Sequence, residues 1–93
     1  MRYNVLNRNS TKAERKFYEL LKALKIPFRH RWLISGREVD FLIGKYVIEV
    51  DSHAQDVSKN IMLVKKGYIP LHIKSNDIGE YLKPWLLKLN GRN

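Results

Sequence analysis

Residues 38–51 have the sequence EVDFLIGKYVIEVD, and this stretch decides the fold. Two runs rich in β-branched and aromatic residues flank Gly44 and Lys45, which indicates two strands joined by a tight turn. A two-residue loop with glycine in first position favours a type II′ turn. Such a turn fixes which residues of the two strands face each other, because the pairing is counted outward from it.

The counting brings acidic residues together. Asp40 pairs with Glu49, and Glu38 pairs with Asp51. Because side chains alternate along a strand, these four carboxylates share one face of the hairpin. Two apolar residues lie with them, Leu42 and Val47. The opposite face is apolar apart from one hydroxyl and carries Val39, Phe41, Ile43, Tyr46, Ile48 and Val50.

Carboxylates that face each other across two strands repel, and a hard divalent cation would relieve that repulsion. Asp is a poor strand former, yet Asp40 interrupts a strongly apolar run. This favours a metal site, with Asp40 and Glu49 as ligands. The alternative is an ordinary solvated face whose carboxylates are neutralised by Lys or Arg.

The rest of the chain predicts an α/β fold made of one domain, residues 1–93. Thr11 and Glu14 form a capping box that opens a helix ending before Pro27. Strands follow at residues 30–34, 38–43 and 46–51, then a helix at 54–66 with Val57, Ile61 and Val64 facing inward, and a strand at 68–74 whose Pro70 suggests a sheet edge. A last helix begins at Asp77 and is kinked by Pro84. The third and fourth strands, joined through a helix, should be parallel.

The charge balance narrows the class of partner. The chain has 18 Lys and Arg against 9 Asp and Glu, a net charge of +9, which favours binding to nucleic acid. Cysteine is absent, so disulfides and thiolate metal sites are excluded. No apolar run is long enough to span a membrane, and no signal-peptide pattern is present, so we expect a cytoplasmic protein.

Several segments, in this order, resemble the PD-(D/E)XK nuclease superfamily, and more closely its branch of very-short-patch-repair endonucleases. They are Thr11-Lys12-Ala13-Glu14, residues 38–43, Val47-Ile48-Glu49-Val50-Asp51 with His53, and Lys66-Gly67-Tyr68. The resemblance implies a restriction-endonuclease-like αβββαβ core, a mixed four-stranded sheet flanked by helices, here with an added C-terminal helix. It also implies a site with Mg²⁺ or Mn²⁺.

The same resemblance assigns roles to individual residues. Asp40 is the metal-binding aspartate, Glu49 the second acidic ligand, and Asp51 a further acidic residue where many members have lysine. Glu14 points at the site from the first helix, and His53 is a candidate acid–base group. Relatives often have Gly and two more residues between the aspartate and the histidine, so His53 is open to another orientation.

The basic residues expected to hold the phosphate backbone are Lys12, Lys59 and Lys74, and the missing motif lysine leaves its role to Lys59 or Lys74. Trp32 could stack a base, although core packing is expected for it and for Trp85; His30 and His72 are expected on a sheet surface.

The sequence thus predicts a metal-dependent endonuclease acting on DNA, for which a homodimer would suit double-strand cutting. Two alternatives remain. One is an inactive nucleic-acid-binding module of a larger repair, restriction or mobile-element assembly, and the other is an RNA-directed toxin or processing nuclease.

Overall fold

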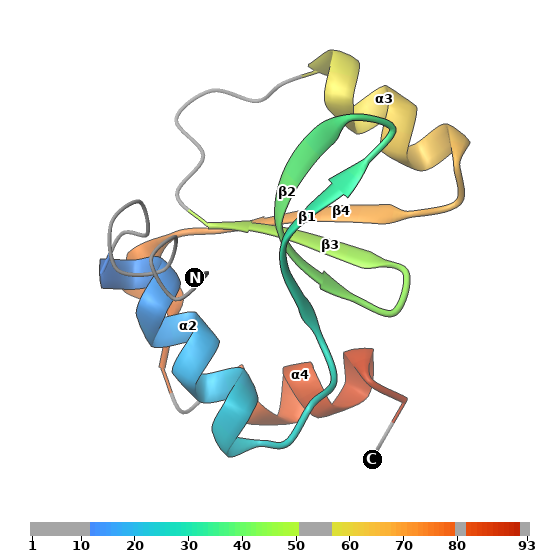
Figure 1. Cartoon of the computed structure of the whole chain (residues 1–93). Coiled ribbons are helices and arrows are strands. Elements are labelled where there is room, and N and C mark those ends of the chain that lie inside the picture. The colour runs from blue at the N-terminus through green and yellow to red at the C-terminus, as the bar shows by residue number, and fades with distance from the viewer. Residues whose placement is uncertain (1–11, 51–56, 80–81, 92–93) are drawn as a thin grey trace, which may run out of the picture.

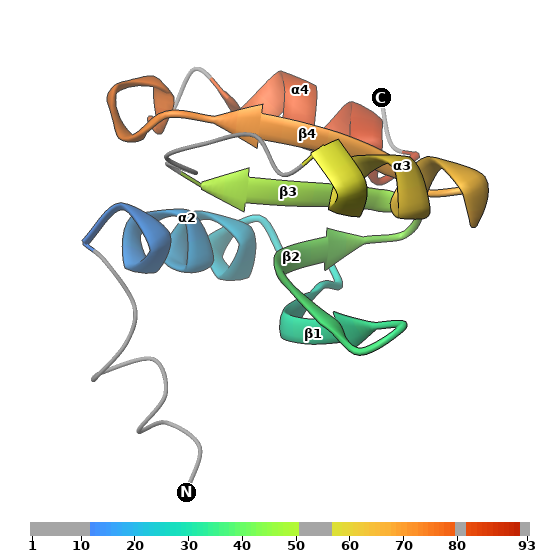
Figure 2. The same cartoon turned by 90° about the horizontal axis from the view of Figure 1, so that it is seen from above.

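A computed structural model describes residues 12–50, 57–79 and 82–91. Along the chain these form α2 (Lys12–Ala23), β1 (Arg29–Ile34), β2 (Arg37–Ile43), β3 (Tyr46–Val50), α3 (Val57–Lys65), β4 (Ile69–Ile73), a 3-10 turn η1 (Ser75–Asp77) and α4 (Lys83–Leu89). The four strands make one sheet in the order β1-β2-β3-β4. Helices α2 and α4 lie on one side of the sheet and α3 on the other (Figure 1, Figure 2). The predicted α/β architecture is confirmed.

Two tight hairpins build the antiparallel part of the sheet. Gly44 has φ +59° and the register that follows is Ile43 with Tyr46, as the two-residue turn requires. The first hairpin turns at Ser35 and Gly36, whose φ values of +51° and +76° are both positive, as a type I′ turn demands. Strand β4 pairs with β3 in parallel, and it is an edge strand, which explains how Pro70 is tolerated there.

The sheet separates two apolar clusters. The larger packs α2 and α4 against one face and includes Phe17, Leu21, Phe41, Ile48 and Leu86. The smaller packs α3 against the other face and includes Val39, Leu42, Val47 and Leu63. Val39 was expected beside Phe41, so that expectation is wrong. The strict alternation is lost at Asp40, where the β1–β2 register has no pair between His30–Phe41 and Trp32–Val39.

The predicted inward face of the third helix is also wrong. Val57, Ile61 and Val64 of α3 are 63%, 51% and 60% exposed, whereas Leu63 is fully buried. The helix is rotated so that Leu63 enters the smaller cluster and Lys59 approaches Glu49. The sheet face beneath α3 carries a carboxylate as well as apolar side chains, and a cation from the helix satisfies it better than a methyl group would.

The C-terminal helix begins later than predicted. Asp77 ends a short 3-10 turn, and α4 starts at Lys83 with Pro84 in its first turn. Proline fits there because the first N–H groups of a helix have no partner within the helix, so no kink is needed. Trp85 packs against the larger cluster as expected. Trp32 is 39% exposed, and the Arg29 guanidinium carbon lies 4.3 Å from the centre of the Trp32 ring. Core packing for Trp32 is therefore wrong.

Candidate active site

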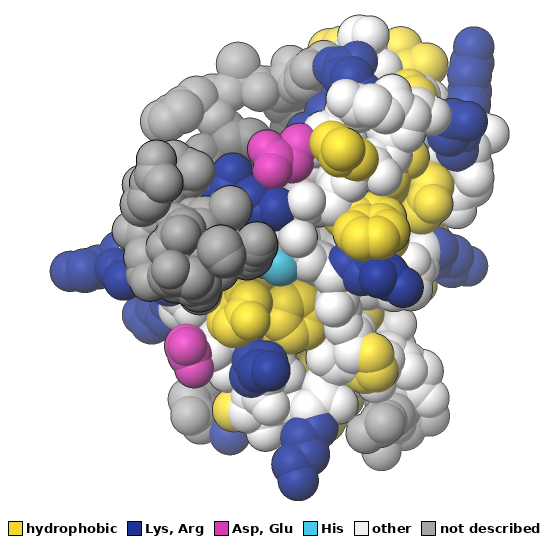
Figure 3. All heavy atoms as spheres, viewed as in Figure 1, with side chains coloured by type: hydrophobic (Ala, Val, Ile, Leu, Met, Phe, Trp, Pro, Cys, Tyr) yellow, Lys and Arg dark blue, Asp and Glu magenta, His cyan; other side chains and the backbone are white. Residues whose placement is uncertain are grey.

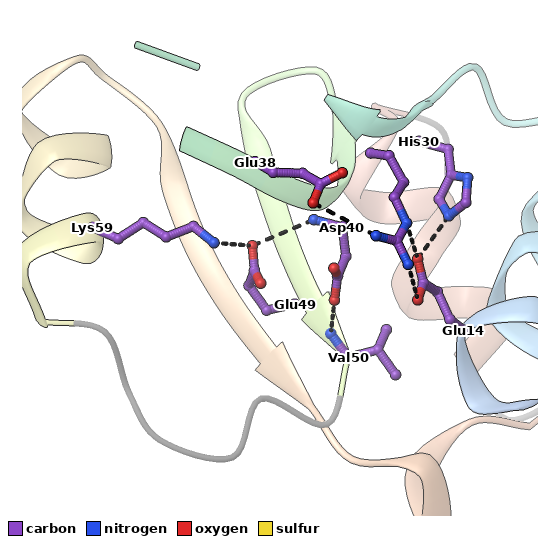
Figure 4. A network of polar contacts seen from close by, with 8 residues as sticks. Glu14, His30, Glu38, Asp40, Glu49, Val50 and Lys59 are labelled. Carbon is purple, nitrogen blue, oxygen red and sulfur yellow. Dashed lines mark hydrogen bonds and ion pairs between the residues drawn. The ribbon is translucent and has the colours of Figure 1, made fainter. Parts of the chain in front are cut away.

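Asp40 and Glu49 lie side by side on neighbouring strands. The main-chain N–H of Asp40 lies 3.4 Å from Glu49 Oε2, and the main-chain N–H of Val50 donates a hydrogen bond of 2.9 Å to Asp40 Oδ2 (Figure 4). Each carboxylate thus contacts the backbone of the opposite strand just beyond the last ladder pair, Phe41 with Ile48. The arrangement holds two acidic side chains close together at the end of the hairpin.

Glu14 approaches the same place from α2. It is only 5% exposed, and its carboxylate binds His30 Nε2 at 2.8 Å and Arg31 Nε at 3.3 Å. Figure 4 shows Glu14, from the helix, directed at His30 and lying on the same side of the view as Asp40. The role of Glu14 at the site stays a prediction. The capping partner Thr11 lies outside the described residues, so the capping box stays a prediction.

The neighbours His30 and Arg31 both reach Glu14, which regular alternation along a strand forbids. Arg31 has φ +56°, a left-handed conformation that costs about 1–3 kcal/mol for a residue other than glycine. This local twist turns Arg31 toward Glu14 and also places it against Glu38, 3.5 Å away. It occurs opposite Asp40, where the ladder is interrupted.

Sequence reasoning missed both residues of this pair. His30 was expected on the sheet surface, but its ring packs 4.8 Å from Phe41 and its side chain is 14% exposed. Counting outward from Ser35 and Gly36 places Arg31 across from Asp40, as counting from the other turn places Glu49 there, but it does not show that His30 and Arg31 both bind Glu14.

Lys59 provides a cation beside Glu49. It extends from α3, and its Nζ lies 3.3 Å from Glu49 Oε2, with side-chain exposures of 17% and 11% (Figure 4). Lys59 and Lys74 are the two lysines suggested in place of the missing motif lysine. In the part of the chain that the structure describes, only Lys59 forms an ion pair with an acidic residue of the site. Lys12 and Lys74 are exposed, at the start of α2 and just after β4.

Burial raises the pKa of both central carboxyls. For Asp40, removal from water is the largest cause and the charge of Glu14 adds to it, while the hydrogen bond from Val50 opposes the rise in pKa. For Glu49, burial again dominates the raised pKa and the charge of Asp40 adds to it, while Lys59 opposes it. Adjacent carboxyl groups whose pKa values are raised in this way are typical of functional sites.

The donor set suits a hard cation. Asp40 and Glu49 offer oxygen ligands, and Mg²⁺ typically takes one or two carboxylates with water and substrate phosphate. Within residues 12–50, 57–79 and 82–91, no three acidic or histidine side chains gather closely enough to hold an ion alone. The predicted third ligand Asp51 and the candidate acid–base group His53 lie outside the described residues, so their roles stay predictions.

No protein-family profile matches the chain, and no curated protein matches it. Among solved structures it is similar to the catalytic domain of the homing endonuclease I-Bth0305I, with 31% sequence identity and a TM-score of 0.66. The match covers 86% of this chain and 94% of that one, so it includes nearly the whole of that domain. No helix in the described part of the chain is long and apolar enough to span a membrane. Identity and coverage at this level show that the chain belongs to the family of nuclease-fold domains that includes the catalytic domain of I-Bth0305I.

Proposed function

We propose that the chain is a divalent-metal-dependent endonuclease that hydrolyses phosphodiester bonds in DNA. The observation that carries this proposal is the Asp40–Glu49 pair, in which a half-buried aspartate and a buried glutamate are kept adjacent at the end of a hairpin in a protein of net charge +9. The similarity to a homing endonuclease catalytic domain supports the same class of activity. Lys and Arg side chains are spread over the face seen in Figure 3, with hydrophobic side chains exposed between them, which suits a polyanionic substrate.

In this proposal Asp40 and Glu49 hold the ion, with Asp51 as a further ligand. A bound Mg²⁺ or Mn²⁺ would supply an activated water and neutralise charge on the phosphate. Lys59 stands beside Glu49 and can pass from it to a substrate phosphate oxygen. Glu14, fixed by His30 and Arg31, keeps Arg31 aligned beside Asp40. His53 is proposed to protonate the leaving oxygen.

The test is a plasmid-nicking assay with Mg²⁺ and with Mn²⁺. Asp40→Asn should reduce cleavage by at least about 100-fold while DNA affinity stays within about twofold, because the variant removes a metal ligand and not a DNA contact. Exposed Asp77, which lies in the turn η1, gives a matched control: Asp77→Asn removes the same charge and should cut at the normal rate. Equal cleavage by wild type and Asp40→Asn would refute the assignment.

A second candidate function has its own supporting observation. Both Glu14 and Glu49 already bind cationic side chains, Arg31 and Lys59, as the carboxylates of a metal-free binding module would. Calorimetric titration with Mg²⁺ and Mn²⁺ separates the two functions. Binding that is lost in Asp40→Asn supports the nuclease, whereas no heat up to millimolar metal supports an inactive DNA-binding module within a larger assembly. A homodimer stays a prediction that sedimentation with DNA would test.

A further inference from the structure

Two adjoining hollows lie along the connection between α2 and β1. The first has a volume of about 550 Å³ and is lined by Tyr18, Lys22, Lys25, Ile26, Pro27, Phe28 and His30. The second, of about 420 Å³, is lined by Pro27, Phe28, Arg29, Leu42 and Gly44. Pro27 and Phe28 line both, so the two hollows adjoin at these residues, and together they are called the basic groove below.

The groove is positively charged. Lys22, Lys25 and Arg29 line it, and none of the described lining residues is acidic. All three basic residues are exposed, and the Arg29 guanidinium lies over the Trp32 ring. Three cations in a lining that includes no acidic residue fit the phosphates of a nucleic-acid strand better than they fit a neutral ligand.

Aromatic rings alternate with these cations. Phe28 and Tyr18 are half-buried and meet edge to face, with ring centres 5.2 Å apart, and Tyr18 also contacts the His30 ring at 5.3 Å. The rings are thereby held rigidly at the wall of the groove. Proteins that bind single-stranded nucleic acid combine aromatic side chains, on which the bases stack, with basic side chains, which bind the phosphate backbone.

Lys25 occupies a backbone position that favours glycine. Its φ is +57°, in the turn just after α2, where the left-handed conformation disfavours any side chain with a Cβ. The chain nevertheless has a lysine there, and its side chain lines the groove. A residue that is unfavourable for local folding and points its charge into a hollow is better explained by binding than by stability.

The groove leads to the candidate active site. His30 lines the first hollow and binds Glu14 through Nε2 at 2.8 Å. The next residue, Arg31, binds the same carboxylate and lies opposite Asp40. A strand seated in the first hollow would therefore contact His30, whose carboxylate partner Glu14 also binds the residue across from Asp40.

We propose that the basic groove binds one DNA strand beside the cleavage site, with Lys22, Lys25 and Arg29 on its phosphates and a base against Phe28. The proposal rests on the proposed function for its choice of DNA, and it adds where the strand lies. It explains why a lysine occupies the strained position after α2.

The decisive variant is Lys25→Gly, because binding and stability should change in opposite directions. Glycine relieves the left-handed strain, so Tm should stay the same or rise by up to about 5 °C. Affinity for a labelled single strand of about 16 nucleotides, measured by fluorescence anisotropy in EDTA, should fall about fivefold. The slope of log K against log salt should become shallower by about 0.7, the contribution of one phosphate contact.

Lys22→Ala tests the same groove from the helix and should weaken binding by a similar factor. Lys65→Ala is the matched control: it also removes one exposed lysine, from the last turn of α3, which lies far from the C-terminal end of α2 that carries Lys22 (Figure 1). The control should keep the wild-type salt slope and lose less than about twofold in affinity.

Unchanged affinity in Lys25→Gly and in Lys22→Ala, or the same loss in Lys65→Ala, would overturn the groove. Equally tight binding of a polyglutamate peptide with the same dependence on Lys25 would also overturn it, because the groove would then bind any negatively charged chain and not nucleic acid in particular. An RNA strand that binds at least tenfold more tightly than DNA of the same sequence would overturn the choice of DNA. Binding is measured in EDTA, so a failure of metal-dependent cleavage leaves this result standing and is detected separately by Asp40→Asn.

Discussion

The carboxylate of Asp40 accepts a hydrogen bond from the main-chain N–H of Val50, at 2.9 Å. In a regular antiparallel ladder a main-chain carbonyl oxygen would accept such a bond. Here, beyond the last regular pair of β2 and β3, a side-chain oxygen accepts it. The bond ties Asp40 to the strand that carries Glu49, so the distance between the two acids is set by the backbone. The site therefore depends on Asp40 in two ways, as an acceptor and as a charge.

These two roles can be separated with two neutral substitutions. Asp40→Asn keeps an oxygen that can accept the bond from Val50, whereas Asp40→Ala leaves that buried N–H without its acceptor. We expect Asp40→Ala to be less stable than Asp40→Asn by about 1–3 kcal/mol, the cost of an unsatisfied buried donor. Urea unfolding of both variants measures the difference. Equal stabilities would show that water replaces the carboxylate oxygen.

The charge of Asp40 should cost stability at neutral pH. Burial raises the pKa of Asp40 above its ordinary value of 3.8, so the folded state holds the proton more tightly than the unfolded state. Stability from this group is therefore lost as the pH rises from the ordinary pKa through the raised one. Asp40→Asn removes that loss, and we expect it to be more stable than wild type at pH 7.

The same linkage predicts how the advantage changes with pH. Below the ordinary pKa the carboxyl is protonated in both states, so the difference between wild type and Asp40→Asn should shrink toward zero near about pH 3. Thermal melts from about pH 3 to 8 give the profile. An advantage that stays constant across this range would mean that the asparagine stabilises the fold through packing, and that the buried charge is not the cause.

Lys59 should matter more for cleavage than for folding. It is the cation beside Glu49, and we expect Lys59→Met to cut DNA about 100-fold more slowly, the usual effect of losing one fixed charge at a phosphate. Its stability should fall by about 1–3 kcal/mol, because Glu49 loses its partner in a largely buried position. Single-turnover cleavage and urea unfolding measure the two effects.

Lys65→Met serves as the control for this variant, since it removes a lysine from the same helix on its exposed side. Normal cleavage by Lys59→Met would assign the Lys59–Glu49 pair to folding alone. It would also favour Lys74 for the role of the motif lysine.

The sequence determined the hairpin and the register that brings Asp40 next to Glu49, because a two-residue turn fixes the pairing. Alternation placed Val39 on the wrong face. It did not determine the rotation of α3. Val57, Ile61 and Val64 form a valid amphipathic stripe, yet they are exposed, because the sheet beneath the helix presents Glu49 and attracts Lys59. Periodicity predicts which residues share one face of a helix, but it does not predict what that face packs against.

Arg31 was hidden for a different reason. Its positive φ comes from tertiary contacts with Glu14 and Glu38, and no local pattern marks a left-handed arginine within a strand. The same holds for the later start of α4, where Asp77 offered an equally good cap but only Pro84 fixes the first turn. The sequence therefore did not predict contacts between polar residues far apart in the chain, nor which of two possible residues starts the last helix.

The Glu14–Arg31 pair should be strongly coupled. Glu14 is 5% exposed, so Arg31→Gln leaves a buried carboxylate with His30 as its main partner, and Glu14→Gln leaves the guanidinium with Glu38, which is far more exposed than Glu14, as its acidic partner. We expect each single variant to lose about 2–4 kcal/mol of stability, and the double variant to lose less than the sum by about 1–3 kcal/mol. A double-mutant cycle by urea unfolding measures this coupling. Additive losses would show that the two side chains contribute to stability separately.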